Sequence, residues 1–189
     1  MNSKRSKNSL KQLYPIAKKY GFEAAYPSAI ARNPYMLLKG GECLVLLSGG
    51  LIMITNTDVH FGEDKLYLRC WCSDHKNQAN ATVVSSQRFY ENGKLVTRNE
   101  NYYRAAARKL IEDIAKWRGI PVSDVELDHV NRMRGDNRRC NLRPADAEQN
   151  NWNKDAVKIE KAFYTFSDLE EKLASGEWVR EVTEDETNY

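Results

Sequence analysis

Hydrophobic and polar residues alternate with two different spacings along the chain, and each spacing predicts a different kind of element. Between residues 43 and 98, branched and aromatic residues gather in short runs separated by glycine-containing or polar turns, which is typical of a strand-rich region. The runs are CLVLLS, LIMITN, KLYLRCWC, ATVVSSQRFY and KLVTR, and Glu91-Asn92-Gly93 predicts a hairpin turn between the last two. Residues 101–118 carry apolar side chains at helical spacing before Gly119, which predicts a helix that ends at this glycine. The apolar face of that helix is expected to contain Tyr103, Ala106, Leu110, Ile111, Ile114 and Trp117.

The two ends of the chain carry weaker patterns. Residues 8–21 have an apolar spacing compatible with a short helix that stops at Gly21, and residues 22–41 are rich enough in proline and glycine to predict an irregular connection. Near the other end, Ser167 and Glu170 have the spacing of a capping box, which predicts a short helix closed by Gly176. The last nine residues are expected to fray.

Residues 124–154 predict a compact unit of strand, loop, strand and helix. VELDHV alternates as a strand does, NRMRGDNRR is a polar loop with a turn at Gly135-Asp136-Asn137, and CNLRPA is a second short strand. Asp146 and Gln149 then form a capping-box pattern that opens a helix through Lys154. Together these segments predict a ββα unit.

Four polar residues in this unit suit the hydrolysis of a phosphodiester. Asp128 and His129 lie on the first strand, Asn141 enters the second strand, and Asn150 lies on the helix. Such hydrolysis needs an activated water and a cation on the leaving oxygen. A histidine with a pKa near about 6.5 can accept the proton of water, and a hard cation such as Mg²⁺ prefers carboxylate and amide oxygens.

These residues resemble the His-Asn-His (HNH) nuclease family, closest to the variants found in phage and intron homing endonucleases. Asp128-His129, Asn141-Leu142-Arg143 and Asn150 match the motif, with asparagine where other members carry the last histidine. The resemblance implies an α+β fold, in which a ββα-metal (His-Me finger) nuclease core follows a strand-rich N-terminal region. It also implies a DNA endonuclease that leaves 5′-phosphate and 3′-hydroxyl ends.

The resemblance assigns a role to each motif residue. His129 would be the base that deprotonates water, Asp128 and Asn150 would bind one Mg²⁺ or Mn²⁺, and Asn141 would fix the loop and the His129 ring. Neighbours on a regular strand point to opposite faces, yet Asp128 and His129 must address one phosphate. Either the strand ends or bulges at this point, or the phosphate straddles its edge.

The net charge of +3 conceals local asymmetry. Residues 1–20 carry six basic residues and no acid, residues 131–143 carry five arginines against one aspartate, and residues 155–189 carry ten acids against four bases. The basic patches suggest a polyanion partner, although solvated surfaces explain the charge alone equally well, and the resemblance implies that this partner is double-stranded DNA with the arginine-rich loop on its phosphates. An ordinary basic terminus explains residues 1–20 equally well. The predicted DNA-binding residues are Arg132, Arg134, Arg138, Arg139 and Arg143.

The composition gives no sign of a membrane-spanning protein, and nothing in the sequence suggests export. No stretch approaches the roughly 20 apolar residues of a membrane span, and the N-terminus lacks the apolar core of a signal peptide. We therefore expect a soluble, cytoplasmic protein with reduced cysteines, whether cellular or phage-encoded and acting in a bacterial host. Cys70 and Cys72 are interpreted as core residues in preference to a structural zinc site. His60 is expected on the surface, and His75 in a polar loop without a catalytic role.

The predicted organisation has four parts. Residues 1–41 form a basic N-terminal helix and arm, residues 42–119 a strand-rich region plus helix that is a candidate for DNA recognition, residues 120–155 the nuclease core, and residues 156–189 a short strand and helix with an acidic tail. Two alternatives remain open: an HNH nuclease used for restriction or defence, and a non-catalytic DNA-binding protein that uses the ββα unit. The sequence does not distinguish nicking from double-strand cleavage and does not predict the oligomeric state.

Overall fold

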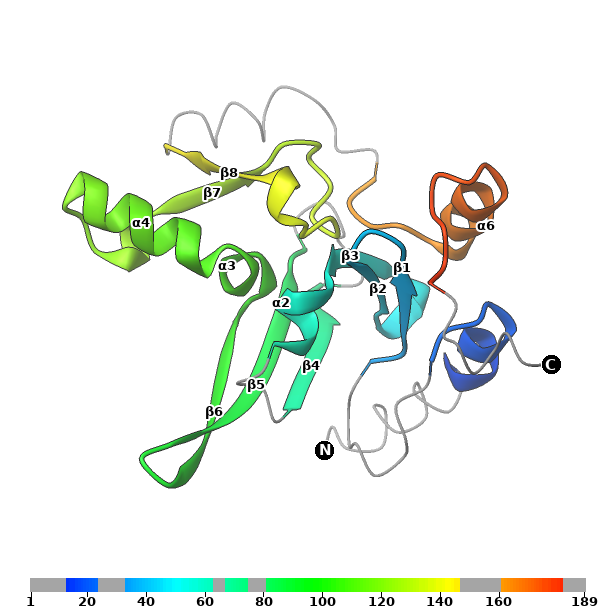
Figure 1. The fold of residues 1–189 in the computed structure, drawn as a ribbon, viewed down its shortest axis with the longest axis horizontal. Helices are drawn as coiled ribbons and strands as arrows, with labels where there is room; N and C mark the ends of the chain where they lie inside the picture. The colour runs from blue at the N-terminus through cyan, green and yellow to red at the C-terminus, as the bar shows by residue number, and fades with distance from the viewer. Residues whose placement is uncertain (1–12, 24–32, 63–66, 75–80, 147–160, 182–189) are drawn as a thin grey trace.

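A computed structural model describes residues 13–23, 33–62, 67–74, 81–146 and 161–181 (Figure 1). Within these residues the fold combines small antiparallel sheets with short helices, which confirms a mixed α+β architecture. No helix in this part of the chain has the length and apolar character that crossing a membrane requires.

The strands form three antiparallel sheets within the described residues. The first, here called the central sheet, contains β1 (Tyr35–Leu38), β2 (Glu42–Leu46) and β3 (Ile52–Asn56). The second, the outer sheet, contains β4 (Tyr67–Cys72), β5 (Val83–Glu91) and β6 (Lys94–Asn101), and the third contains β7 (Glu126–His129) and β8 (Leu142–Ala145). The helical segments are residues 13–19, η1 (Ser48–Gly50), α2 (Thr57–Phe61), α3 (Tyr102–Ala106), α4 (Arg108–Arg118), η3 (Val122–Asp124), η4 (Arg139–Asn141) and α6 (Phe166–Ala174).

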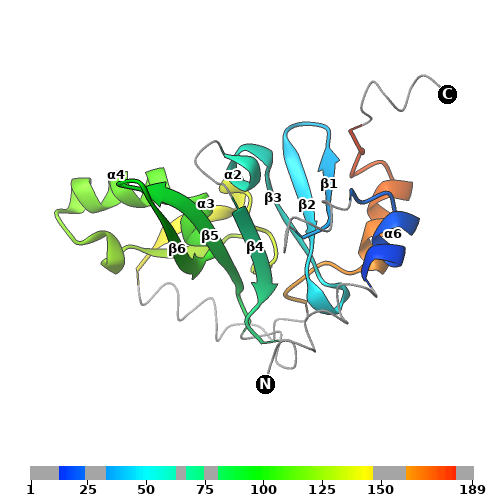
Figure 2. The ribbon, with the colours of Figure 1, turned by 90° about the horizontal axis from the view of Figure 1, so that it is seen from below.

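The central sheet is buried on both faces, which explains why β2 is a continuous apolar run. Cys43 and Val45 belong to one hydrophobic core, whereas Leu44 and Leu46 belong to another, because successive side chains on a strand point to opposite faces. The first core also takes in residues of the outer sheet, α3, α4 and the β7–β8 pair. The second packs against residues 13–19 and α6, which lie together on the other side of the sheet (Figures 1 and 2).

The edge of β3 is covered by two segments that come much later in the chain. Ile54 donates its N–H to the Gly135 oxygen at 2.8 Å, and its own oxygen accepts the N–H of Asn137 at 2.8 Å. Ile52 exchanges two backbone hydrogen bonds with Tyr164, at 2.8 and 3.3 Å. The loop between β7 and β8 is therefore fixed to the central sheet and does not project into solvent.

The helix predicted over residues 101–118 is divided in two. Ala107 has φ −105° and ψ 20°, which separates α3 from α4, and α4 ends as expected at a left-handed Gly119. The predicted apolar face is wrong at Trp117 and Leu110, which are 81% and 37% exposed. The buried stripe of α4 is narrower than predicted and is centred on Ile111, Ile114 and Ala115.

Two short features differ from the sequence-based expectation. β1 lies within residues 22–41, for which an irregular connection was expected, because a strand of four residues is too short to show a reliable alternation. The capping box of α6 uses Thr165 and Asp168 in place of Ser167 and Glu170. The predicted helix from Asp146 to Lys154 lies outside the described residues after its first residue.

Candidate active site

The antiparallel pair β7–β8 positions Asp128 and His129 at the end of a strand. Pairing remains regular through Asp128↔Arg143 and His129↔Leu142, and β7 then ends in a turn in which Arg132 donates its N–H to the His129 oxygen at 2.9 Å. Regular pairing places the two side chains on opposite faces. The Arg143 guanidinium donates to Asp128 Oδ2 at 2.9 and 3.2 Å, so this carboxylate lies over the cross-strand arginine.

The His129 ring is held by Asn137, a residue that the motif did not predict. Asn137 Oδ1 lies 3.1 Å from His129 Nε2, and Asn137 Nδ2 donates to the Arg134 oxygen at 3.2 Å. Because the amide nitrogen of Asn137 donates to the Arg134 oxygen, its own oxygen faces the ring and accepts a hydrogen bond from the Nε2–H of His129. This arrangement leaves Nδ1 of His129 with the lone pair that can accept a proton. Tyr103 packs edge-on against the ring, with centroids 5.7 Å apart.

Burial lowers the pKa of His129 below its ordinary value. The hydrogen bond with Asn137 and the nearby carboxylates of Asp136 and Asp128 raise this pKa, and Arg134 lowers it, but desolvation by the surrounding protein is the largest effect. The imidazole is therefore neutral at neutral pH. A neutral ring with a free acceptor nitrogen is the state that a general base requires.

Asn141 ties the two ends of the loop together. Its Oδ1 accepts the Asn131 N–H at 2.9 Å, and its Nδ2 donates to the Asn131 side chain and to the Asp136 oxygen, both at 2.8 Å. These side-chain hydrogen bonds of Asn141 fall on the loop, and the hydrogen bond to the His129 ring comes from Asn137 within that loop. The sequence signal for Asn137 was the turn at Gly135-Asp136-Asn137, which was interpreted as turn chemistry alone.

The arginines of the loop bind carboxylates of the protein itself. Arg138 binds Asp136 through two hydrogen bonds of 2.8 and 2.7 Å and binds Glu42 at 3.0 Å. Asp136 is fully buried, and its ionised form requires such a partner. Arg139 pairs with Asp58 at 2.7 Å.

The remaining arginines of the predicted DNA-binding set differ in exposure. Arg143 pairs with Asp128 and is half exposed. Arg134 is partly buried and donates to the Ala81 oxygen at 3.4 Å, and Arg132 occupies a left-handed backbone position with φ +62°. The structure therefore brings these five arginines around the loop, but most of their charge faces acids or carbonyls of the same chain.

Only part of the predicted metal site lies in the described residues. The Asp128 carboxylate is 11% exposed and offers the oxygen chemistry that suits a hard cation, whereas Asn150 lies outside the described residues. Across the part of the chain that the structure describes, no group of three or more histidine, cysteine, aspartate or glutamate side chains could hold a metal ion.

The other candidate residues have structural surroundings. Cys70 and Cys72 are both buried in the first core, as expected for packing residues, and burial raises the pKa of the Cys72 thiol. The expectation of a surface position for His60 is wrong: it is buried in α2, and its Nδ1 lies 3.1 Å from the Tyr102 hydroxyl. The sequence around His60 is that of a strand end next to polar residues, and it gives no sign of burial. The partner of His60, Tyr102, belongs to α3, which comes much later in the chain. His75 lies outside the described residues.

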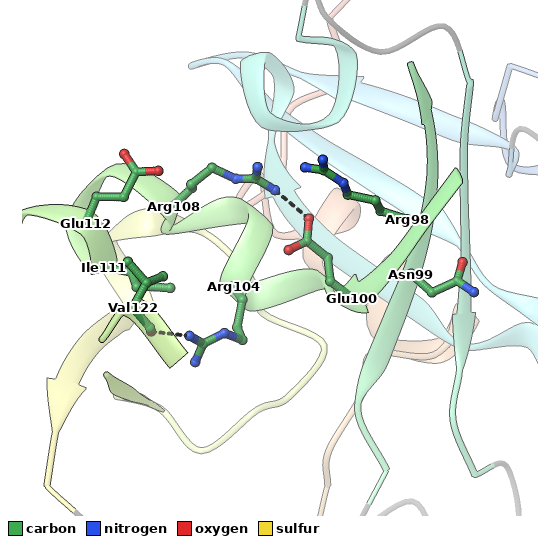
Figure 3. A pocket seen from close by; sticks show the side chains of 8 residues that line it. All are labelled: Arg98, Asn99, Glu100, Arg104, Arg108, Ile111, Glu112 and Val122. Carbon is green, nitrogen blue, oxygen red and sulfur yellow. Dashed lines mark hydrogen bonds and ion pairs between the residues drawn. The ribbon is translucent and has the colours of Figure 1, made fainter. Parts of the chain in front are cut away.

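A separate pocket of about 410 Å³ opens between β6, α3 and α4 (Figure 3). Arg108 pairs with Glu100 across it at 2.6 Å, and Arg104 donates to the backbone oxygens of Val122 and Val125 at 2.8 and 2.9 Å. None of the residues predicted for catalysis, metal or DNA lines this pocket.

The arrangement around β7 and β8 can hold a neutral histidine with a defined acceptor nitrogen at the end of a strand, with the Asp128 carboxylate one residue away on the opposite face. That chemistry suits proton removal from a water molecule. Comparison with known proteins gives no relative for this chain, since no protein-family model, no curated protein and no solved structure matches it.

Proposed function

We propose that the protein is a metal-dependent DNA endonuclease of the HNH type. The observation that carries the proposal is the state of His129: its Nε2 is bound to Asn137, its pKa is lowered by burial, and its Nδ1 is left to accept a proton. The motif spacing from Asp128 to Asn150 supports the same assignment, and so does the antiparallel β7–β8 pair as the first part of a ββα-metal core.

In the proposed reaction, His129 Nδ1 takes a proton from water while the water oxygen forms a bond to phosphorus. The bond between phosphorus and the 3′-oxygen breaks, and that oxygen takes a proton from solvent water, which leaves a 5′-phosphate and a 3′-hydroxyl. Asp128 and Asn150 would hold Mg²⁺ or Mn²⁺, which supplies positive charge for the leaving oxygen when bound. Asn141 keeps the loop in place, and Asn137 keeps the ring in the tautomer that accepts a proton at Nδ1.

The test is cleavage of supercoiled plasmid by the wild-type chain, His129→Ala and His75→Ala, each in Mg²⁺ and in EDTA. Wild type and His75→Ala should cut in Mg²⁺ and be inactive in EDTA. His129→Ala should cut at least about 10²-fold more slowly, the usual effect of losing a general base, while it still binds DNA. Equal cleavage rates for wild type and His129→Ala would show that His129 is not the general base. Full activity in EDTA would show that cleavage does not need a metal ion.

A homing role and a restriction or defence role use the same chemistry, and mapping of cut sites on genomic DNA separates them. A wild-type chain that binds DNA without cutting it in Mg²⁺ or Mn²⁺ would favour the non-catalytic DNA-binding alternative.

A further inference from the structure

The proposed base, His129, has two neighbours that come from different elements. Tyr103 of α3 packs edge-on against its ring, with the centroids 5.7 Å apart. Asn137 joins the same ring to Arg134, because its Oδ1 lies 3.1 Å from His129 Nε2 and its Nδ2 donates to the Arg134 oxygen at 3.2 Å. Burial lowers the pKa of Arg134 and its interaction with Tyr103 raises this pKa, and the charge of Arg134 acts on His129 in turn. Arg134, Tyr103 and His129 therefore form one interacting cluster.

Arg134 differs from three other arginines of the predicted DNA-binding set in what its guanidinium contacts. Arg138, Arg139 and Arg143 pair with carboxylates of the protein. Arg134 is half-buried, and its guanidinium donates to a main-chain oxygen, that of Ala81, at 3.4 Å. Among the ion pairs of the described residues, none contains Arg134. Within this part of the chain, its charge therefore meets a carbonyl dipole in place of an acid.

A half-buried guanidinium in these surroundings favours the binding of an anion. Arginine keeps its proton in proteins, so burial removes water from the Arg134 side chain without removing its charge. One long hydrogen bond to a carbonyl replaces only part of that water. An anionic oxygen would form charge-assisted hydrogen bonds with the remaining N–H groups, and such bonds are stronger beside protein than in bulk water.

We propose that Arg134 binds the phosphate that is attacked at His129, as a second catalytic residue of the nuclease. The inference rests on the proposed function for the reaction itself. It separates one arginine from the five that the sequence assigned to the DNA backbone in general. An arginine that only holds the backbone contributes to affinity, whereas an arginine on the attacked phosphate contributes to the rate.

The shape and the charge of a guanidinium both suit the attacked phosphate. Its planar fork can donate two parallel hydrogen bonds to the two non-bridging oxygens. When the water oxygen forms its bond to phosphorus, negative charge grows on these oxygens. The hydrogen bonds from Arg134 are then stronger in the transition state than in the bound substrate, and this difference accelerates the reaction.

The position of Arg134 also bears on how one phosphate can meet residues from opposite faces of β7. Pairing with β8 directs Asp128 and His129 to opposite faces. Arg134 belongs to the His129 side, through Asn137 and Tyr103. A phosphate at the end of the strand would therefore receive Arg134 and the attacking water from one side. The other side is left to Asp128 and the cation that we propose for it.

The test compares two arginines that are alike in charge and burial. The variants of the full chain are Arg134→Ala, Arg134→Lys and, as the matched control, Arg104→Ala. Arg104 is also half-buried and also donates to main-chain oxygens, but it lies at the pocket beside α4 (Figure 3). Single-turnover cleavage of supercoiled plasmid is measured in Mg²⁺, and binding of a short fluorescent duplex is measured in EDTA. Circular dichroism gives a temperature at which every variant is folded.

Arg134→Ala should cleave about 10²-fold more slowly, the usual effect of losing one donor to charge that develops in the transition state. Its affinity for the duplex should fall by less than about tenfold, because one phosphate contact among several is lost. Arg134→Lys should cleave at a rate between those of wild type and Arg134→Ala, since lysine keeps the charge but not the planar fork. Arg104→Ala should cleave as wild type does.

A second measurement does not depend on cleavage. The ring protons of His129, identified by their loss in His129→Ala, are followed by NMR at one pH while the duplex is added in EDTA. A phosphate held by Arg134 next to the ring should shift these signals in wild type and in Arg104→Ala. The signals should stay in place in Arg134→Ala.

The two measurements separate this inference from the proposed function. Equal cleavage rates for wild type and Arg134→Ala would overturn the inference and leave the nuclease standing. Equal losses in Arg134→Ala and Arg104→Ala would also overturn it, as would His129 signals that do not move in wild type. If the chain never cuts but the signals shift only when Arg134 is present, the nuclease is rejected and the phosphate site at Arg134 is supported.

Discussion

At the scale of single residues, the chemistry of His129 depends on one amide. Asn137 accepts from Nε2 and is itself held by its N–H to Ile54 and its Nδ2 to Arg134. An imidazole without this partner could exchange between its two tautomers, and the tautomer protonated at Nδ1 would present the wrong nitrogen to water. Asn137 is therefore a positioning residue for the proposed base.

Replacement of Asn137 should change the pH dependence of cleavage as well as its rate. The hydrogen bond to Asn137 raises the pKa of His129, so Asn137→Ala should move the acid limb of the kcat profile to lower pH. Asn137→Asp adds a carboxylate and should move it to higher pH. Asn131→Ala is the control, since Asn131 bonds to Asn141 and Asp136 but not to the ring. If cleavage by both Asn137 variants is slower but the acid limb of the kcat profile does not move, Asn137 supports the structure of the loop and does not position the base.

The lowered pKa of His129 also makes the stability of the folded protein depend on pH. The folded state lowers the pKa of His129, so the unfolded chain binds more protons between that lowered value and about 6.5. The contribution of the neutral ring to stability is complete above about pH 6.5 and is lost as the pH falls through the lowered pKa.

Arg138 and Arg139 are neighbours whose replacement by alanine should lower stability by very different amounts. Arg138→Ala would leave the fully buried Asp136 without its arginine and should lower the free energy of unfolding by about 3 kcal/mol or more. Arg139→Ala removes an exposed pair with Asp58 and should cost less than about 1 kcal/mol. Urea unfolding at neutral pH measures both. Equal small losses would mean that Asp136 is satisfied without Arg138.

At the scale of elements, α6 begins with a capping box that differs from the one with the more obvious sequence pattern. The Asp168 carboxylate accepts hydrogen bonds from the Thr165 N–H at 2.6 Å and from its hydroxyl at 2.7 Å. Thr165→Ala should therefore lower the free energy of unfolding by about 1 kcal/mol, the usual cost of losing an N-cap.

Ser167→Ala is the matched control for Thr165→Ala, because Ser167 is exposed and lies inside the first turn. It should change stability by less than about 0.5 kcal/mol, as other surface substitutions do. Thermal or urea unfolding of the two variants makes the comparison. A larger loss for Ser167→Ala than for Thr165→Ala would place the cap at the position that the sequence pattern favoured.

Local signals in the sequence predicted the elements that depend on local chemistry. The apolar runs became β2 and β3, Asn92-Gly93 became the hairpin turn, and Gly119 ended α4 with its left-handed backbone. The same patterns predicted the α+β class and the strand, β7, that carries Asp128 and His129. Long-range partners were not predictable in this way. The pairing of β3 with Gly135 and the partners of Asp136 join residues far apart in the chain, and no spacing in the sequence encodes them.

At the scale of the whole molecule, Gly135 lies where three segments of the chain cross. A Cβ at this position would come within 2.9 Å of the Phe163 ring and 3.2 Å of the Ile52 oxygen. The backbone of Gly135 also donates to Ala162 and accepts from Ile54, both at 2.8 Å. The loop between β7 and β8, the central sheet and the segment before α6 therefore share one close contact.

Gly135→Ala should destabilise the whole molecule by about 1–3 kcal/mol, because backbone atoms of two other segments must move to admit a methyl group. Gly119→Ala is the control: it has no neighbour within 4 Å, and its cost reflects the left-handed backbone alone, about 1 kcal/mol. A smaller loss for Gly135→Ala than for Gly119→Ala would show that the crossing is loosely packed.

The hydrogen bonds that fix the loop to β3 also determine how fast its amide protons exchange with solvent. The N–H groups of Ile54, Gly135 and Asn137 are held by different segments, so none can open alone, and we expect all three to exchange only in the largest unfolding event of the protein. A loop with that protection cannot close over a substrate as a lid does. In the nuclease that we propose, the duplex would then have to bend or widen to bring its phosphate to His129, and the stiffness of the DNA would become a source of sequence preference.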